Sequence, residues 1–315
     1  MELPYIKEDL IKAYDRVKPH IHKTPVLSSK LINEIAGCEL YFKCENFQKA
    51  GSFKIRGATN AILQLSEEEQ QKGVVTHSSG NFAQALALAA RNLSIPAYIV
   101  MPENAPKVKV DAVRGYGAEI RFCINKQEER ERTMREWQQE TGASFLHPYD
   151  NRNVILGQST CGYELIEEVP DLDNIISPVG GGGLISGVAL AAKFFSSNTK
   201  VYAAEPTGAD DAQRSLKDGK IYPSVNPNTI ADGLLTSLGE HTFPVIQSLV
   251  KDIFTVTDEE IIEAMKLTWT RLKVIIEPSS ATTLAVILKN KAIFANQKNA
   301  LIISGGNVDL NNLPF

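Results

Sequence analysis

The chain has 315 residues, which is enough for about two domains and for a core that needs no disulfide or metal to hold it together. Apolar residues make up 43% and charged residues 22%, as is usual for a soluble globular protein, and the formal net charge is −4. This mild acidity, spread along the chain, argues against nucleic acid as a partner. No apolar run reaches the roughly 18 residues of a membrane span, which argues against a membrane protein.

The N-terminus and the cysteines bear on the compartment. Residues 1–4 lack the basic and apolar layout of a secretory signal. The four cysteines have no spacing typical of a metal site and are interpreted as reduced thiols: Cys38, Cys44, Cys123 and Cys161. These features predict a cytoplasmic protein.

Short β-rich runs alternate with helical stretches along the whole chain. Several runs are almost continuously apolar, as expected of strands that are covered on both faces in a parallel sheet. The predicted strands are residues 39–42, 74–78, 97–101, 119–123, 174–179, 200–204 and 300–304. The alternation predicts an α/β fold with open, mostly parallel sheets.

Three segments carry helix signals. Residues 66–69 and 257–260 each fit a capping box, in which two side chains satisfy the free amides at a helix start. After the second box, five apolar residues recur at helical spacing and predict a core-facing stripe: Ile261, Ile262, Met265, Trp269 and Leu272. Residues 126–140 are dense in charges of both signs, which favours a solvated helix face with i, i+4 ion pairs over a partner-binding face.

Ligands of such folds bind beyond the carboxyl ends of the strands, so the turns after strands are the places to search. In residues 177–187 a predicted strand runs into four glycines and then into a helical pattern. Backbone amides without side chains can converge on an anion, and the helix adds its positive end. The segment has neither the Walker A nor the Rossmann spacing. We interpret it as a phosphate cradle; the alternative is a tight strand-to-helix turn.

A lysine between apolar neighbours marks the second candidate, residues 51–57. Lys54 lies between Phe53 and Ile55 at the junction of a loop and a helix. Burial would depress its pKa and make it a usable amine nucleophile, as a Schiff base with an aldehyde cofactor requires. The alternative is a lysine that extends to the surface.

Two further turns carry polar groups. Residues 77–84 offer two hydroxyls, a glycine and an amide at a helix start, which is a pattern for binding a carboxylate; the alternative is simple N-capping. At the end of the last predicted strand, the hydroxyl of Ser304 could bond a buried ring nitrogen, or the segment could be a plain turn. Together the four candidates are the parts needed to hold pyridoxal phosphate and an amino acid.

With these motifs in place, the chain resembles a fold-type II pyridoxal-phosphate enzyme of the serine/threonine dehydratase and serine racemase family. The likeness spans residues 24–309 and rests on residues 51–57, 78–81 and the four glycines. Serine racemase-like members also share residues 43–49, 229–233 and 276–278. The resemblance implies a tryptophan synthase β-like fold, with two open, twisted, mostly parallel sheets flanked by helices. A large cofactor-binding domain would comprise residues 1–50 and 150–315, and a small substrate-loop domain residues 51–149.

The resemblance also implies roles for individual residues. Lys54 would form the Schiff base with pyridoxal phosphate, and Phe53 would pack on its ring. Asn81 would bond the cofactor 3-oxygen, and Ser304 the pyridine nitrogen. The phosphate would be held by Gly180, Gly181, Gly182 and Gly183. The substrate carboxylate would be bound by Ser78, Ser79, Gly80 and Asn81.

Further ligands follow from the same resemblance. Glu205, the backbone carbonyl of Ala209 and Asp211 match a divalent-cation site for Mg²⁺, or for Ca²⁺ or Mn²⁺. Serine racemases can bind ATP between subunits, and the residues that match that pattern are Lys49, Gln84, Tyr116, Lys273 and Asn307. The family pattern usually has a serine at the position of Lys30, and this difference argues against nucleotide binding. Family members are usually dimers, so we expect a homodimer.

The implied activity is elimination of water from L-serine or L-threonine, to give a 2-oxo acid and ammonia, or racemisation of serine, or both. Lys54 would remove the Cα proton, and Ser79 would act as a second proton donor on the opposite face. A neutral Ser304 would leave the ring nitrogen unprotonated and favour loss of the β-hydroxyl.

Three alternatives stay open. One is a 3-hydroxyaspartate dehydratase, with a distal carboxylate accepted by Arg132, Arg135 or Arg152. Another is a β-replacement enzyme of the cysteine synthase kind, against which the cation triplet argues. The third is a non-catalytic phosphate binder, against which the intact Lys54 and Ser79 argue. Three positions bear on substrate preference: Phe82 and Ser159, which depart from the family pattern, and Tyr149, which lies beside the expected substrate site.

Overall fold

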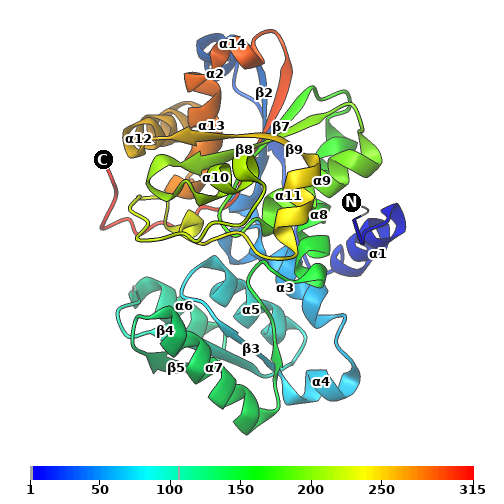
Figure 1. The fold of residues 1–315 in the computed structure, drawn as a ribbon, viewed down its shortest axis with the longest axis vertical. Coiled ribbons are helices and arrows are strands. Elements are labelled where there is room, and N and C mark those ends of the chain that lie inside the picture. Colours follow the sequence, from blue (N-terminus) through cyan, green and yellow to red (C-terminus); the bar gives the residue numbers. More distant parts are fainter. Residues whose placement is uncertain (1–2, 106) are drawn as a thin grey trace.

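The computed structural model describes residues 3–105 and 107–315, and Figure 1 shows two layered units, one above the other. Within these residues the strands form one six-stranded and one four-stranded sheet, and nearly all neighbouring strands are parallel. The predicted α/β fold with two open, mostly parallel sheets is confirmed. The prediction about a signal at the N-terminus rests partly on residues 1–2, which lie outside the described residues.

The six-stranded sheet is parallel throughout except for the pairing of its first two strands. One of its two central strands is apolar from residue 300 to residue 303, because helices cover both faces. Ala300 and Ile302 pack into one hydrophobic cluster, and Leu301 and Ile303 into the other. In sheet order the strands are β1 (Val26–Leu27), β2 (Glu39–Cys44), β10 (Lys298–Ile303), β7 (Asn174–Pro178), β8 (Lys200–Pro206) and β9 (Val250–Val256).

Helices enclose this sheet on two sides (Figure 1). One face is covered by α1 (Lys7–Val17), α8 (Arg152–Glu168), α9 (Gly183–Phe195) and α11 (Thr242–Leu249). The other is covered by α2 (Lys30–Ala36), α12 (Asp258–Leu267), α13 (Pro278–Lys289) and α14 (Lys291–Phe294). Between β8 and β9 the chain forms η3 (Thr207–Ala209), α10 (Asp211–Asp218) and η4 (Asp232–Leu234) before α11.

The four-stranded sheet is built entirely from residues 74–145 and is parallel throughout. In sheet order its strands are β5 (Glu119–Cys123), β4 (Ala97–Pro102), β3 (Val74–His77) and β6 (Ser144–Phe145). One face packs against α3 (Lys54–Ile62), α5 (Asn81–Asn92) and α6 (Lys107–Gly115), and the other against α7 (Gln127–Thr141). The short α4 (Glu67–Lys72) precedes β3. The domain boundaries near residues 50 and 150 stay a prediction.

All seven predicted strands are present, and no end differs from its prediction by more than two residues. Ser78 and Ser304 lie just after their strands rather than within them. The pattern does not predict β1 and β6, which are two residues long and too short to show a period. It also misses β9, an edge strand that exposes Lys251 and Asp252.

The helix signals are confirmed. Ser66 and Thr257 each form a complete capping box at the start of α4 and α12. Ile261 and Met265 are fully buried, and the apolar stripe continues into a π-helical turn, η5 (Thr268–Leu272). Lys273, with a φ of 64°, ends this turn.

The charged segment forms α7, a solvated helix as predicted. On its outer face Arg132 pairs with Glu129 at 2.7 Å and with Glu136 at 2.8 Å. Its inner face buries Met134 and Trp137 against the four-stranded sheet. The ion pairs lie on the surface, so each contributes little to stability.

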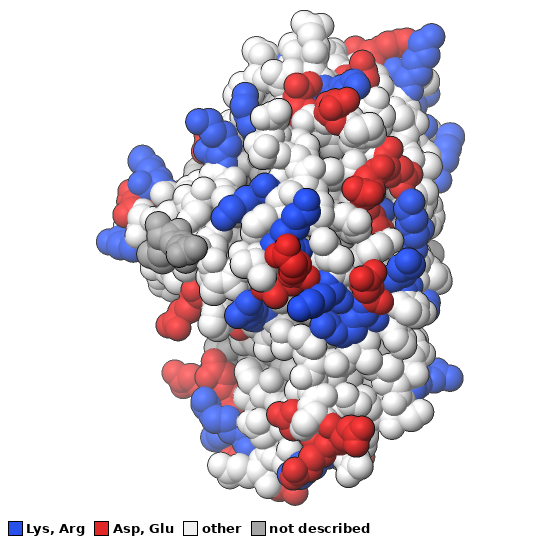
Figure 2. Space-filling view, turned by 90° about the vertical axis from the view of Figure 1, so that its right-hand side faces the viewer, with Lys and Arg blue, Asp and Glu red and all other residues white. Residues whose placement is uncertain are grey.

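Figure 2 shows one face of the molecule, on which acidic and basic side chains are interspersed rather than gathered into a stripe of one sign. Among the described residues, no helix combines the length and the apolar character that crossing a membrane requires.

Candidate active site

The turn between β7 and α9 is made of glycines that leave no room for side chains. A Cβ on Gly181 would lie 2.4 Å from ring atoms of Tyr149, and one on Gly183 would lie 2.9 Å from the Tyr149 Cβ. Gly182 has a φ of +88°, which favours glycine. The bare amides at the start of a 13-residue helix fit an anion, because the helix dipole adds positive potential there.

Lys54 is the first residue of α3, and its ammonium lies among apolar rings. Its Nζ is 4.9 Å from the centroid of the Phe53 ring and 5.9 Å from that of Phe82, and it donates a hydrogen bond to the Pro148 carbonyl at 3.1 Å. Burial lowers the pKa of Lys54 to about 8, although the negative charge of Glu277 opposes this shift. A tenth of the amine is therefore neutral at about pH 7, which makes Lys54 a usable nucleophile.

Ser304 follows β10 and is 4% exposed. Its Oγ lies 3.0 Å from the Oγ of Ser280, a residue of the first turn of α13. The backbone carbonyl of Ser304 accepts a hydrogen bond from the Phe53 amide at 3.0 Å. The end of β10 is thus tied to the start of α3, and the Ser304 hydroxyl is a buried, uncharged group at this junction.

The predicted carboxylate-binding segment joins β3 to α5. The Ser78 amide donates to the Val100 carbonyl at 3.1 Å, and the Gly80 amide donates to the Ser78 Oγ at 3.4 Å. Ser78, Ser79 and Gly80 are partly exposed at the helix start. The hydroxyls of Ser78 and Ser79 can therefore donate hydrogen bonds to an acidic group.

Asn81 links the two sheets. Its Nδ2 donates to both carboxylate oxygens of Glu277, at 3.0 and 3.1 Å, and its Oδ1 accepts from the Asn307 Nδ2 at 2.9 Å. The same Asn307 Nδ2 also donates to the Ala50 carbonyl at 2.9 Å. The structure therefore brings α5, the start of α13 and the C-terminal loop together around Lys54.

Glu277 is a site residue to which the sequence assigns no role. It is 3% exposed at the N-cap of α13, and burial together with Asp232 raises its pKa to about 7. A Cβ on Gly305 would lie only 2.8 Å from its Oε1. The sequence signal was the motif of residues 276–278, which marks a helix start but not a carboxylate beside the lysine.

His147 and Tyr149 form a second group that the sequence did not combine. Their ring centroids are 4.5 Å apart, and the His147 Nδ1 accepts a hydrogen bond from the Asp150 amide at 2.8 Å. Burial lowers the pKa of His147 to about 4 and raises that of Tyr149 to about 12. Both side chains are therefore uncharged at neutral pH, and Tyr149 covers the glycine turn.

A profile of the pyridoxal-phosphate dependent enzymes matches residues 17–306. The chain belongs to this family. The serine racemase of Dictyostelium discoideum is 53% identical over 312 residues, which cover 97% of this chain and 96% of that protein. The beta-hydroxyaspartate dehydratase of Paracoccus denitrificans is 49% identical over 308 residues, covering 98% of each. The solved structure of maize serine racemase superposes with a TM-score of 0.95 at 49% identity, covering 96% of this chain and 94% of that one.

The family resemblance inferred from the motifs is thus confirmed, and this chain is a pyridoxal-phosphate dependent enzyme. The residues present fit the cofactor. The glycine turn offers amides to a phosphate, the Lys54 amine can condense with an aldehyde, and the Ser304 hydroxyl offers a partner to a ring nitrogen. The roles of the individual residues stay predictions.

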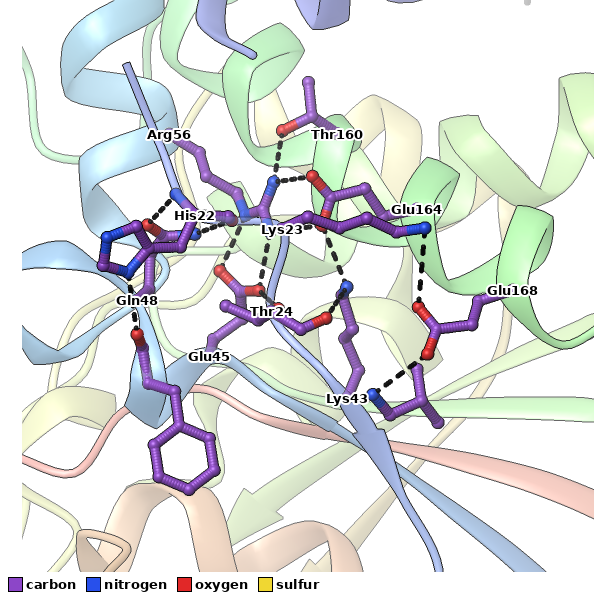
Figure 3. A network of polar contacts seen from close by, with 12 residues as sticks. His22, Lys23, Thr24, Lys43, Glu45, Gln48, Arg56, Thr160, Glu164 and Glu168 are labelled. Carbon is purple, nitrogen blue, oxygen red and sulfur yellow. Dashed lines mark hydrogen bonds and ion pairs between the residues drawn. The ribbon is translucent and has the colours of Figure 1, made fainter. Parts of the chain in front are cut away.

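A buried ion network, drawn in Figure 3, anchors the helix of Lys54. The guanidinium of Arg56 bonds both oxygens of Glu45, at 2.7 and 2.8 Å, and both oxygens of Glu164, at 2.7 and 2.9 Å. Lys43 also pairs with Glu164 at 2.9 Å, so two positive and two negative charges balance. Burial alone would lower the pKa of Arg56, but the two glutamates raise it well above its usual value.

This network connects α3 to β2, to η1 (Glu45–Phe47) and to α8. Because all four charged side chains are buried, removing one would leave an unpaired charge and cost roughly 3–5 kcal/mol. The start of α3 is therefore held in place two residues beyond Lys54. The sequence did not indicate this network, because its members are far apart along the chain.

Of the three predicted cation ligands, Glu205 lies near the end of β8, and Ala209 and Asp211 lie in the η3 turn and at the start of α10 that follow it. Glu205 is 1% exposed and accepts hydrogen bonds from the amides of Ala212 and Gln213, at 2.7 and 2.9 Å. Asp211 begins α10, and its Oδ2 is buried without a hydrogen-bond partner among the described residues. Burial raises the pKa of Glu205 to about 8 and that of Asp211 to about 6. Such a pair fits a cation that would restore the charge balance.

Other predicted residues are placed as follows. Phe82 is buried in the core of the four-stranded unit, and the Ser159 Oγ donates to the Leu156 carbonyl at 2.6 Å, so both act first as packing residues. The Lys49 Nζ donates to the His20 carbonyl at 2.7 Å. Arg135 and Arg152 are paired with Glu131 and Asp9, as Arg132 is with its glutamates, and all three are more than half exposed.

Proposed function

We propose that this chain acts on L-serine and L-threonine, eliminating water to give a 2-oxo acid and ammonia, and that it also racemises serine. The observation that carries the proposal is the Lys54 amine, whose pKa burial lowers to about 8, beside the uncharged hydroxyl of Ser304. The likeness to a serine racemase over 97% of the chain supports the substrate class.

Some of the residues bind the cofactor and the substrate, and others transfer protons. When bound, pyridoxal phosphate supplies an aldehyde for amines and a ring that delocalises negative charge from the substrate Cα. Amides of the glycine turn hold the phosphate, and Phe53 packs beside the ring. Hydroxyls and amides of residues 78–81 hold the substrate carboxylate and orient the Cα proton.

Two groups move protons. The free amine of Lys54 takes the proton from the Cα on one face. Ser79 lies on the segment expected at the other face, and there it returns a proton to give the opposite enantiomer. The β-hydroxyl can instead leave as water by taking up the proton that Lys54 removed from the Cα. Hydrolysis of the dehydrated enamine then consumes one water and gives pyruvate and ammonia.

A comparison of Lys54→Ala with wild type tests the proposal. We expect wild type with cofactor to release pyruvate and D-serine from L-serine, and 2-oxobutyrate from L-threonine. The variant should keep its fold by circular dichroism and lose both reactions by at least about 10³-fold. Turnover by the variant at the wild-type rate would refute the assignment. Formation of a new thioether when a thiol is added would favour β-replacement instead.

A second candidate substrate is 3-hydroxyaspartate, and one observation favours it. The Nε of Arg130 is buried without a hydrogen-bond partner among the described residues, while its Nη2 donates to Asn125. Burial lowers the pKa of His77 at the end of β3; Glu131 opposes this shift, and the positive charge of Arg130 adds to it. A cation whose charge acts on His77, the residue that precedes the substrate segment, suits a second carboxylate, and the likeness to the Paracoccus dehydratase agrees.

Arg130→Met separates the two substrates. We expect kcat/KM for L-threo-3-hydroxyaspartate to fall about tenfold or more, because a charged hydrogen bond is lost, while that for L-serine stays within about threefold. The matched control is Arg132→Met, whose arginine is exposed and paired with glutamates. Equal effects of the two variants would exclude a role for Arg130 in selecting the diacid.

We also propose that Glu205, the Ala209 carbonyl and Asp211 bind Mg²⁺, Ca²⁺ or Mn²⁺. The buried and unpartnered Asp211 Oδ2 supports this. Bound cation would stabilise the segment between β8 and α11, which reaches Asp232 beside Glu277. Isothermal titration with Mg²⁺ should give one site per chain in wild type and none in Asp211→Asn.

The finer expectations from the resemblance stand as proposals. A homodimer is supported by the exposed Leu31 and Ile35 of α2, which with Glu34 and Arg271 line a hollow that a second copy could cover. Light scattering tests it. To bind ATP, Lys49 and Asn307 would have to give up their present hydrogen bonds to the carbonyls of His20 and Ala50. Titration with ATP tests this proposal. A cytoplasmic location also stays an expectation.

A further inference from the structure

Thr242 is a fully buried residue at the start of α11, and its hydroxyl contacts the glycine turn. Its Oγ1 accepts a hydrogen bond from the Gly239 amide at 2.9 Å and lies 2.9 Å from the Gly181 carbonyl oxygen. The Gly239 carbonyl oxygen is farther away, at 3.2 Å, and already accepts from the Phe243 amide at 2.9 Å. The single hydroxyl proton of Thr242 therefore lies toward Gly181.

This hydrogen bond fixes the direction of the next amide in the turn. The peptide bond between Gly181 and Gly182 is planar and trans, so its carbonyl oxygen and its N–H point in opposite directions. Because the Gly181 carbonyl points to Thr242, the Gly182 N–H points away from α11. This N–H belongs to the N-cap residue of α9, where the helix dipole adds positive potential.

A turn made of glycines needs such a restraint. Without a Cβ, the peptide groups between glycines rotate more freely than others. Gly182 has a φ of +88°, and a Cβ on it would lie 2.8 Å from both the Thr242 Oγ1 and the Ile246 Cδ1. The turn therefore packs directly against α11, and the Thr242 hydroxyl lies at that contact.

Asp150 holds the start of α11 in place. Its carboxylate accepts hydrogen bonds from the amides of Glu240 and His241, at 3.0 and 2.7 Å. A Cβ on Gly239 would lie 2.2 Å from the Asp150 Cγ, so the segment before α11 packs directly against this side chain. The Thr242 hydroxyl is thus fixed by contacts within the protein before any ligand binds.

We propose that Thr242 is a positioning residue that aims the Gly182 amide at the phosphate of the cofactor. The inference rests on the proposed function, which places that phosphate at the glycine turn. The Thr242 hydroxyl acts through the Gly181 carbonyl, so it needs no contact with the phosphate itself. An amide that is already aimed loses little freedom on binding, and the hydrogen bond therefore increases affinity for the cofactor.

The direct test follows the amide signals of the turn by NMR in the full-length protein. When glycine alone carries ¹³C at its carbonyl and ¹⁵N at its amide, only a glycine that follows another glycine correlates the two labels. In this sequence such glycines are Gly181, Gly182, Gly183 and Gly306. An amide proton moves downfield when it is donated to a phosphate. We expect the Gly182 amide proton of the wild-type apoprotein to do so when pyridoxal phosphate binds.

Thr242→Val removes the hydroxyl with little change in size. The peptide group of Gly181 and Gly182 can then rotate, so the downfield movement of the Gly182 signal should be lost. Equilibrium dialysis should show that affinity for pyridoxal phosphate falls about fivefold, the factor for one net hydrogen bond. Thr242→Ser keeps the hydroxyl and should restore both the shift and the affinity.

Thr268→Val is the matched control. Thr268 is also buried, and its hydroxyl also donates to a backbone carbonyl, that of Ala264 at 2.9 Å, but it lies in η5 beyond α12. We expect this variant to keep the wild-type shift and affinity. Circular dichroism checks that each variant folds.

The wild-type spectrum alone can overturn the inference. A Gly182 signal that does not move on binding would do so, whether or not any variant folds. A Thr242→Val variant with the wild-type shift and affinity, or one that behaves like Thr268→Val, would do so as well. If the signals of Gly181 and Gly183 also stay in place, the phosphate lies elsewhere and its proposed site fails. If either of them moves while Gly182 does not, only the role of Thr242 fails.

Discussion

The N-termini of α9 and α5, which we expect to bind the cofactor phosphate and the substrate, offer different groups to their ligands. The start of α9 follows β7 through four glycines and offers only backbone amides, whereas the start of α5 follows β3 through Ser78, Ser79 and Asn81. Both use the positive end of a helix. The first can attract a phosphate of any ligand but has no side chain with which to choose among them. The second adds hydroxyls and an amide, which can both select a substrate and carry a proton.

The difference predicts opposite responses to substitution. At the glycine turn an added side chain collides with its neighbours, so substitutions there should weaken binding of the cofactor. At the serine turn the side chains are partly exposed, so changes there should alter the reaction while the cofactor stays bound.

Within the two turns, the largest loss of cofactor affinity is expected for Gly181→Ala. Its Cβ would lie 2.4 Å from the Tyr149 ring, so the ring or the turn must move by on the order of 1 Å, which can cost about 100-fold. Equilibrium dialysis should show that affinity for pyridoxal phosphate falls by about that factor. Gly115→Ala, in open space within α6, serves as control and should bind normally. Retained affinity in Gly181→Ala would show that the glycines serve only the turn.

Ser79→Ala should separate the two reactions. Without a proton donor on the second face, formation of D-serine should fall about 100-fold, while pyruvate formation falls far less. Chiral chromatography and a pyruvate assay on the same samples measure both. Cofactor affinity should not change. If both reactions fall equally, Ser79 binds the carboxylate and donates no proton.

The pH dependence of cofactor attachment comes next. Burial lowers the pKa of Lys54 from 10.5 to about 8, and only the neutral amine attacks an aldehyde. The rate of attachment to apoprotein should rise about fivefold from pH 7 to pH 8 and level off above about pH 9. Glu277→Gln removes a charge that raises this pKa, so the midpoint should move to lower pH. A midpoint near 10.5 would show that the ammonium is not desolvated.

The smallest effect that we expect is on thermal stability. It concerns the start of α10, which offers carboxylates where the start of α5 offers hydroxyls. Saturating Mg²⁺ should raise the Tm by about 3 °C through binding to the folded state. Asp211→Asn should abolish the increase, as differential scanning calorimetry would show. An increase that persists in the variant would place the cation elsewhere.

The sequence predicted the parts of the site that are local. Four glycines after a strand, a lysine between apolar residues and a serine at a strand end each lie within a few residues of one another. The parts that it missed are assembled by tertiary contacts. Asn81 meets Glu277 across 196 positions and Arg56 meets Glu164 across 108, so neither pair leaves a local pattern.

The difference between local and tertiary signals also explains which strands were predicted and which were missed. Parallel strands with both faces covered show continuous apolar runs, as at Ile175 and Ile176 of β7, and were predicted. The edge strand β9 exposes charged residues and shows no such run.

The most direct test of the account is a proton NMR time course of the holoenzyme with L-serine in D₂O, with chiral analysis of the quenched products. We expect pyruvate together with D-serine that carries deuterium at Cα, because Lys54 and Ser79 exchange protons with solvent on opposite faces. Serine that keeps its Cα proton, with no pyruvate formed, would contradict it.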